Sequence, residues 1–378
     1  MTALTPGAAR SADGTRGGWF RPPQSLASLA WVTWRQHRAA IIGLAVLYGG
    51  LAVIMVWAAL QGHANYTALI RDRCIGSTQL VRCGPLLGDF PWLMNTTYPI
   101  AVAMALHIVP LLTGMFLGAP VLAREFEQGT VRFAWTQGTS RTRWAVVQLT
   151  LLAIPVTAAA AALGALAAWS VRPFGPMWGV SLWRSGQFDA TAVTLAGWTL
   201  FAFSLGTTVG VALRRTVPAM AVTAASLAGL LGVTYWKLND LLLGSRPRIG
   251  RDPAIALQAG FPVSDSGPVR ILDAMLNEGA GPMNPGPAGS LLLRGWYTGP
   301  DGHRLIGASA DRLLSASQHT TSAGQWSSWL TRHHYAFWVS YQPPGRYWIF
   351  QSIEGGALLV LTLLLGAATI WLVRHRRA

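Results

Sequence analysis

Charged side chains are scarce in this sequence. Only 11% of the 378 residues are Asp, Glu, Lys or Arg, whereas a soluble domain carries about a quarter. Hydrophobic residues make up 52%, so the composition argues against an ordinary soluble domain and indicates a membrane protein. The 29 basic residues include one lysine, Lys237, and they are spread along the chain rather than gathered on one polar helix. This spread favours membrane topology over nucleic-acid binding.

Motifs for nucleotide binding and catalysis are also lacking. No G-x-x-x-x-G-K-[ST] sequence occurs, and Lys237 is followed by leucine, so we do not expect the chain to hydrolyse ATP itself. There is no H-E-x-x-H zinc motif and no G-x-S-x-G nucleophile elbow. His333 and His334 are adjacent but have no cysteine or carboxylate at ligand spacing. We therefore predict no catalytic residue and no metal site.

Six apolar runs are long enough to cross a bilayer, which takes about 20 residues of helix. They cover residues 39–60, 98–123, 145–171, 190–213, 217–236 and 355–373. The predicted fold is an all-α polytopic membrane protein with six transmembrane helices and a large extracytoplasmic loop between the fifth and the sixth.

Arginine is most frequent before the first run, after the second, after the fourth and after the sixth. By the positive-inside rule this places both termini in the cytosol. The predicted segments are a disordered cytosolic tail (1–24), an interfacial amphipathic helix (25–38), helices 1–5 (39–236) with a cytosolic loop (124–144), an extracytoplasmic region (237–350), and helix 6 with a basic tail (351–378). An equally weighted alternative makes residues 25–38 a cytosolic extension of the first span.

The two cysteines, Cys74 and Cys83, both fall in the loop after the first span, which this topology places outside. Two cysteines in one loop on the oxidising side predict a disulfide. Closing so short a ring restricts the loop by roughly 2–3 kcal/mol in the chain-entropy model. Two free thiols or a metal site are weaker interpretations.

Two GxxxG motifs lie inside the apolar runs, Gly114 with Gly118 and Gly206 with Gly210. Small residues at this spacing let helices approach closely in lipid. Packing within one bundle is the favoured interpretation, and a dimer contact is the alternative.

Prolines inside the second run, at 110 and 120, predict bends there. His107 is interpreted as the one titratable side chain, tyrosine aside, well inside a span, either functional or satisfied by a neighbouring helix. The aromatic stretch 326–350 predicts residues at the membrane interface or, alternatively, a substrate-binding lip of short helices.

The polar stretch 124–144 separates the second and third runs and holds two acidic residues, Glu125 and Glu127. A helix beginning near Arg124 would carry both in its first turn, where negative charge suits the helix dipole. Phe133 and Trp135 would then be apolar anchors for a partner. The alternative is that the glutamates neutralise nearby arginines or cap the helix.

This stretch resembles the Glu-x-Glu-x-Gly-Thr signature of ABC-2 type ABC transporter permeases, here Glu125, Glu127, Gly129 and Thr130. Further segments resemble an actinobacterial branch of that family: 31–38, 136–144 and 341–354. The resemblance implies a permease subunit of an exporter in the bacterial plasma membrane, working as a homodimer or heterodimer among membrane lipids and without nucleic acid.

In that family the cytosolic loop docks on a separate ABC ATPase subunit. The resemblance therefore implies a coupling site made of Glu125, Glu127, Gly129, Thr130, Phe133 and Trp135. It also implies that ATP and Mg²⁺ bind the partner ATPase and that this chain binds no cofactor. The rival functions are a membrane-embedded enzyme that uses the external loop and a signalling protein that borrows the permease fold.

Overall fold

The computed structural model describes residues 26–72, 97–128, 141–172, 187–234, 248–251, 291–305, 313 and 323–375. Within these residues, six helices are long and apolar enough to cross a membrane: Trp31–Ala68, Ile100–Gln128, Thr142–Val171, Ala192–Leu213, Thr216–Val233 and Pro344–His375. The predicted number of spans is confirmed.

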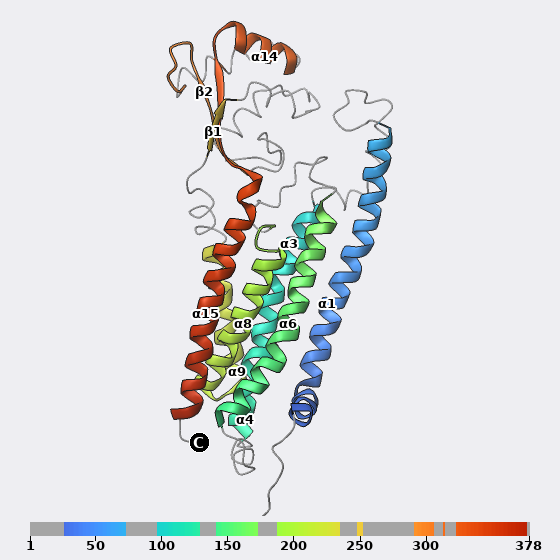
Figure 1. Ribbon diagram of the computed structural model, residues 1–378, viewed down its shortest axis with the longest axis vertical. Coiled ribbons are helices and arrows are strands. Elements are labelled where there is room, and N and C mark those ends of the chain that lie inside the picture. Colours follow the sequence, from blue (N-terminus) through green and yellow to red (C-terminus); the bar gives the residue numbers. More distant parts are fainter. Residues whose placement is uncertain are drawn as a thin grey trace, which may run out of the picture.

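These spans stand side by side as one bundle (Figure 1). Their secondary-structure elements are α1 (Leu26–Arg71), α3 (Thr97–Leu112) with η2 (Thr113–Gly118) and α4 (Ala119–Gln128), α6 (Arg141–Val171), α8 (Ala192–Leu213), α9 (Thr216–Val233) and α15 (Tyr347–His375).

Helix α8 is the centre of the bundle. It packs against α15, α6, α9 and all three segments of the second span, whereas α1 packs along α6 and touches η2. Large side chains of α8 such as Trp198 and Phe203 are buried accordingly. Elements that contact α8 are therefore linked to one another through it.

The two GxxxG motifs pack against each other. A Cβ atom on Gly114 would lie 2.7 Å from the nearest backbone atom of α8, and one on Gly118 would lie 2.6 Å away. In return, a Cβ atom on Gly206 or Gly210 would overlap backbone atoms of η2 or α4. Glycine is required because the two backbones touch, and packing within the bundle is confirmed as the role of both motifs.

The second span is irregular just after Pro110, where α3 gives way to the π-helical segment η2. Proline has no backbone N–H and its ring disfavours the regular α-helical ladder, which a wider π turn accommodates. The helix then continues through Pro120 as α4. The bend expected here takes the form of a change in helical winding.

Between α9 and α15 the chain forms an antiparallel sheet of order β1–β3–β2, with strands Arg248–Arg251, Leu291–Thr298 and Ala336–Gln342. Helix α14 (Ala323–Arg332) precedes β3, and the 3₁₀ turn η4 (Pro344–Arg346) joins β3 to α15. The expectation of an all-α protein is wrong here, because aromatic and β-branched residues favour strands. Cross-strand aromatic pairs such as Trp296 with Trp338 line this sheet.

Two helix bounds differ from expectation. Helix α1 runs continuously from Leu26, although its first turns, in the darkest blue, are seen end-on in Figure 1 and so lie at a steep angle to the rest. An interfacial position for 25–38 remains a prediction. Helix α15 begins at Tyr347, ahead of the predicted residue 355, so Glu354 is part of this helix.

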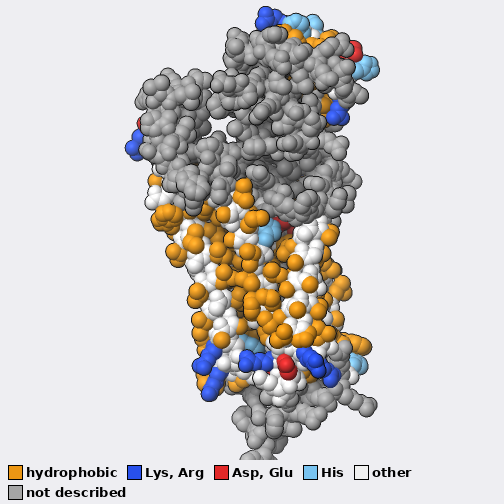
Figure 2. All heavy atoms as spheres, turned by 180° about the vertical axis from the view of Figure 1, so that it is seen from behind, with side chains coloured by type: hydrophobic (Ala, Val, Ile, Leu, Met, Phe, Trp, Pro, Cys, Tyr) orange, Lys and Arg blue, Asp and Glu red, His pale blue; other side chains and the backbone are white. Residues whose placement is uncertain are grey.

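The sides of the bundle are apolar, and basic side chains form a row at one end of this surface (Figure 2). That end, called the arginine end below, holds Arg124, Arg143, Arg214, Arg215 and Arg374 at or near helix termini. The opposite end, where α15 meets the strands, is called the sheet end (Figure 1).

Candidate functional site

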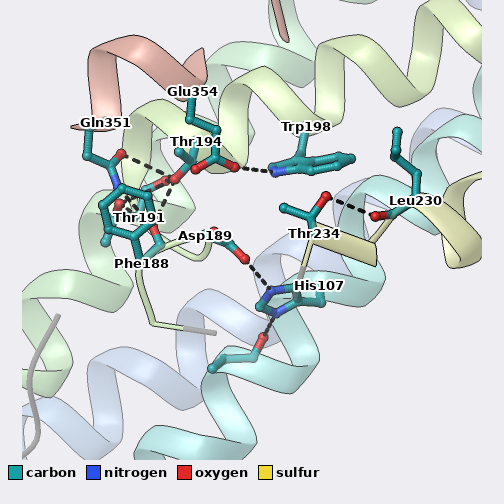
Figure 3. A network of polar contacts seen from close by, with 11 residues as sticks. His107, Phe188, Asp189, Thr191, Thr194, Trp198, Leu230, Thr234, Gln351 and Glu354 are labelled. Atoms are coloured by element: carbon teal, nitrogen blue, oxygen red, sulfur yellow. Dashed lines mark hydrogen bonds and ion pairs between the residues drawn. The ribbon is translucent and has the colours of Figure 1, made fainter. Parts of the chain in front are cut away.

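Polar side chains from three spans and one turn meet near the sheet end of the bundle (Figure 3). They come from α3, from the turn at 187–190, from the start of α8 and from the first turns of α15. We call this set the sheet-end polar cluster, and it comprises His107, Asp189, Thr191, Thr194, Trp198, Tyr347, Gln351 and Glu354.

One half of the cluster is a closed hydrogen-bond network around the carbonyl oxygen of Phe188. That oxygen accepts hydrogen bonds of 2.9 Å from Thr191 Oγ1, Thr194 Oγ1 and Gln351 Nε2. The Tyr347 hydroxyl donates to Thr191 Oγ1 at 3.0 Å. These bonds fasten the start of α15 to the start of α8 and have a structural role.

The other half of the cluster holds two buried carboxylates, Asp189 at 4% exposure and Glu354 at 6%. Glu354 Oε1 accepts a 2.9 Å hydrogen bond from the indole Nε1 of Trp198. Its second oxygen, Oε2, is buried and has no hydrogen-bond partner within the described residues. A buried acceptor without a donor is costly, and ionisable groups inside a membrane span mark functional positions.

His107 faces the carboxylates from α3. Its Nδ1 lies 2.6 Å from the carbonyl oxygen of Ala103, and its Nε2 lies 3.6 Å from Asp189 Oδ2. Nδ1 must carry the proton to donate to that carbonyl, so a neutral ring presents the lone pair of Nε2 toward Asp189. No described Arg or Lys forms an ion pair with Glu354, and the cluster has net negative charge whenever both carboxylates are ionised.

At the arginine end, Glu125 and Glu127 lie in the last turns of α4. The prediction that they open a helix beginning near Arg124 is wrong. The second span has no helix breaker between Pro120 and Gly129, so the helix continues through both glutamates.

Glu127 is exposed and attaches the end of α4 to the start of α9. Its Oε2 accepts hydrogen bonds from the backbone N–H of Thr216 at 3.0 Å and from the Thr216 hydroxyl at 2.6 Å. A carboxylate at a helix N-terminus is favourable because it satisfies a free N–H and meets the positive end of the dipole. The Arg214 guanidinium lies 5.7 Å from the ring centre of Phe126, so the end of α8 and the start of α9 both contact α4.

Glu125 points into the bundle and is only 8% exposed. The side chains of Gln148 in α6 and Gln36 in α1 lie beside its carboxylate. Gln148 Nε2 in turn lies 3.1 Å from His37 Nε2. We call Glu125, Phe126 and Glu127, with these partners, the α4 clasp, because it joins the end of α4 to α1, α6 and α9.

The other predicted coupling residues, Gly129, Thr130, Phe133 and Trp135, lie outside the described residues, as do Cys74 and Cys83. Gly129 directly follows the last residue of α4. The roles of all six remain predictions. Among the described residues, no group of three or more His, Cys, Asp and Glu could hold a metal ion.

Two residues of the cluster were missed by the sequence reasoning. The predicted last span begins at residue 355, whereas the apolar helix observed there covers Pro344–His375 and contains Glu354. The prediction that His107 is the one titratable side chain, tyrosine aside, within a span is therefore wrong. The adjacent Pro343 and Pro344 could have signalled an earlier helix start, since proline favours the first helical turn. Asp189 gives no such signal, because its burial depends on the packing of α3 and α15 around its turn.

A family model described as "ABC-2 membrane transporter related" matches residues 44–237, slightly more than half of the chain. The matched segment contains most of α1 and all of the second to fifth spans, including the α4 clasp. Searches of the curated proteins and of the solved structures gave no match. With its six apolar helices, the chain is a multi-pass membrane protein, and it belongs to the ABC-2 membrane transporter related family, whose members are transport permeases that work with an ABC ATPase.

Proposed function

We propose that this chain forms the membrane pathway of an exporter and is driven by a separate ABC ATPase that docks on residues 129–140. The observation that supports this most is the α4 clasp. Helix α4 ends at Gln128, directly before the docking segment, and its last turns are joined to three other spans. A force applied to 129–140 therefore reaches α1, α6 and α9.

The orientation follows from charge. Arginines gather at the end of the bundle that carries the α4 clasp, and the positive-inside rule assigns that end to the cytosol. Both termini are then cytosolic, the sheet is extracytoplasmic, and the membrane is a bacterial plasma membrane. The segments 31–38, 136–144 and 341–354 support assignment to an actinobacterial branch.

In the proposed mechanism, ATP and Mg²⁺ bind the partner ATPase and this chain binds no cofactor. ATPase closure moves the docking segment, and Glu127 transfers that displacement to α9 through Thr216. Glu125 transfers it to α6 and α1 through Gln148 and Gln36. The permease acts as a homodimer or heterodimer and moves its substrate outward by alternating access.

Co-purification tests the docking segment. The double variant F133A/W135A removes the two apolar anchors and should abolish recovery of a P-loop ATPase, identified by mass spectrometry, with the tagged chain. The matched control is F116A/W57A, which removes one exposed Phe and one exposed Trp from membrane-facing positions. Equal ATPase recovery with F133A/W135A and with the control would contradict docking on this segment.

A further inference from the structure

We infer that an apolar cavity between α1 and α6 binds an acyl chain of one anionic phospholipid, whose phosphate lies against Arg38 and Arg124. The cavity has a volume of about 380 Å³ and is lined by residues of α1, η2 and α6. This volume lies within the range of ligand-binding sites in proteins. We call it the α1–α6 cavity, and nothing in the coupling mechanism uses it.

The lining of the cavity favours an apolar occupant. It consists mainly of aliphatic side chains, among them Leu44, Leu152 and Val156, and contains no charged residue. The hydroxyl of Tyr48, which also lines it, lies 3.2 Å from Thr113 Oγ1 and so has a partner within the protein. A charged group inside the cavity would lose its hydration without gaining a partner. The charged part of an occupant must therefore lie outside the cavity.

The cavity opens toward the bilayer and has the length of a lipid tail. Ala45 of α1 and Ala159 of α6 line it and are exposed on the side of the bundle. Its lining on α6 covers residues 151–159, about 12 Å at the rise of an α-helix. One leaflet contributes about half of the roughly 30 Å hydrocarbon core. A single acyl chain that runs along α1 and α6 therefore matches the cavity in length and direction.

Two arginines lie where the cavity approaches the arginine end. Arg38 is four residues after Trp34 and three before Ile41, so it neighbours both of these lining residues on α1. Arg124 of α4 acts electrostatically on His37, the residue before Arg38. Both arginines are exposed, and within the described residues neither forms an ion pair.

A phospholipid headgroup meets these arginines when its chain occupies the cavity. Basic side chains between membrane helices at the bilayer surface bind anionic headgroups. A zwitterionic headgroup carries its own cation and gains less from two arginines. A second copy of this chain, inserted in the same orientation, would bring its own arginine end beside Arg38 and Arg124, so like charges would meet. The charge at the opening therefore favours an anionic lipid over a second copy.

Native mass spectrometry of the purified full-length chain in a nonionic detergent tests the headgroup contact. Dioleoylphosphatidylglycerol, which is anionic, and dioleoylphosphatidylcholine, which is zwitterionic, are probes with identical chains. The anionic lipid should bind at least threefold more tightly. R38Q/R124Q should remove this preference. The matched control is R215Q/R374Q, which has the same net charge and alters two exposed arginines of the same end, and it should keep the preference.

Filling the cavity tests the acyl-chain contact separately. A45F/A159F adds two phenyl rings to the lining and should weaken the binding of both lipids at least threefold. The matched control is V46F/V53F, which adds two phenyl rings to exposed positions of α1 outside the lining and should bind both lipids as the unaltered chain does.

Three results would overturn the inference: equal binding of the two lipids by the unaltered chain, an undiminished preference in R38Q/R124Q, or undiminished lipid binding by A45F/A159F. Loss of a dimer mass in A45F/A159F with lipid binding unchanged would assign the cavity to a second copy. If one of the two test variants does not elute as a single species, the other decides. The measurement needs no ATPase, so its failure is distinct from a failure of the proposed coupling.

Discussion

Glu125 and Glu127 are two residues apart in α4 but have opposite environments. Residues at this spacing lie about 200° apart around a helix, so one carboxylate enters the bundle and the other faces the start of α9. The two glutamates of the motif therefore make separate contacts, Glu125 inside the bundle and Glu127 with Thr216, and do not form one acidic patch. Within the described residues both carboxylates have partners inside this chain, so the proposed docking surface is assigned to the segment that follows.

The contact between Glu127 and Thr216 gives a prediction for single residues. In E127A the Thr216 amide loses its acceptor, so hydrogen exchange at the first turn of α9 should become faster than in the unaltered chain. E127Q keeps an acceptor oxygen, so its exchange rate at the first turn of α9 should lie between those of E127A and the unaltered chain. Exchange at Thr216 that is equally slow in all three proteins would show that the clasp does not protect this helix start.

At the scale of elements, the number and rough position of the spans could be predicted, because each requires a long apolar run. Helix ends could not. Helix α4 extends through two glutamates whose partners come from α1, α6 and α9, and α15 begins early because Gln351 and Tyr347 bond to the start of α8. The sheet-end polar cluster was missed for the same reason, since Asp189 becomes a buried group only when the spans assemble.

The close approach of the second span to α8 gives a prediction for elements. G206A places a methyl group against the backbone of η2 and α4, and overpacking of this kind costs about 1–3 kcal/mol of unfolding free energy. The melting temperature of the purified chain should fall. G229A in α9 is the matched control, because a Cβ atom there meets nothing within 4 Å.

Alanine is the better helix former, so G229A should leave the melting temperature unchanged or raise it. If G206A melts at or above the temperature of G229A, the two backbones do not touch as described.

At the scale of the whole molecule, α8 and α15 extend between the sheet end and the arginine end. Trp198 belongs to the sheet-end polar cluster and Arg214 contacts the α4 clasp, and both are positioned by α8. Helix α15 carries Glu354 near the strands and ends among the arginines. Helices α8 and α15 therefore connect the sheet-end polar cluster with the arginine end, where the α4 clasp lies.

The proposed orientation predicts the chemistry of Cys74 and Cys83. In intact cells a membrane-impermeant maleimide should label them only after reduction, because they are expected to form a disulfide on the outer side. Variants C74S and C83S should each expose one thiol that is labelled without reduction. Labelling that requires permeabilised cells would reverse the orientation and place the arginine end outside.

Photo-crosslinking tests the central claim, docking of an ABC ATPase on residues 129–140, most directly. A benzophenone amino acid replaces Phe133 in one protein and the membrane-facing Phe116 in another, and each is irradiated in the native membrane. The account predicts a crosslinked product containing this chain and a P-loop ATPase from position 133 and none from position 116. Absence of the product at position 133, or its equal formation at both positions, would contradict it.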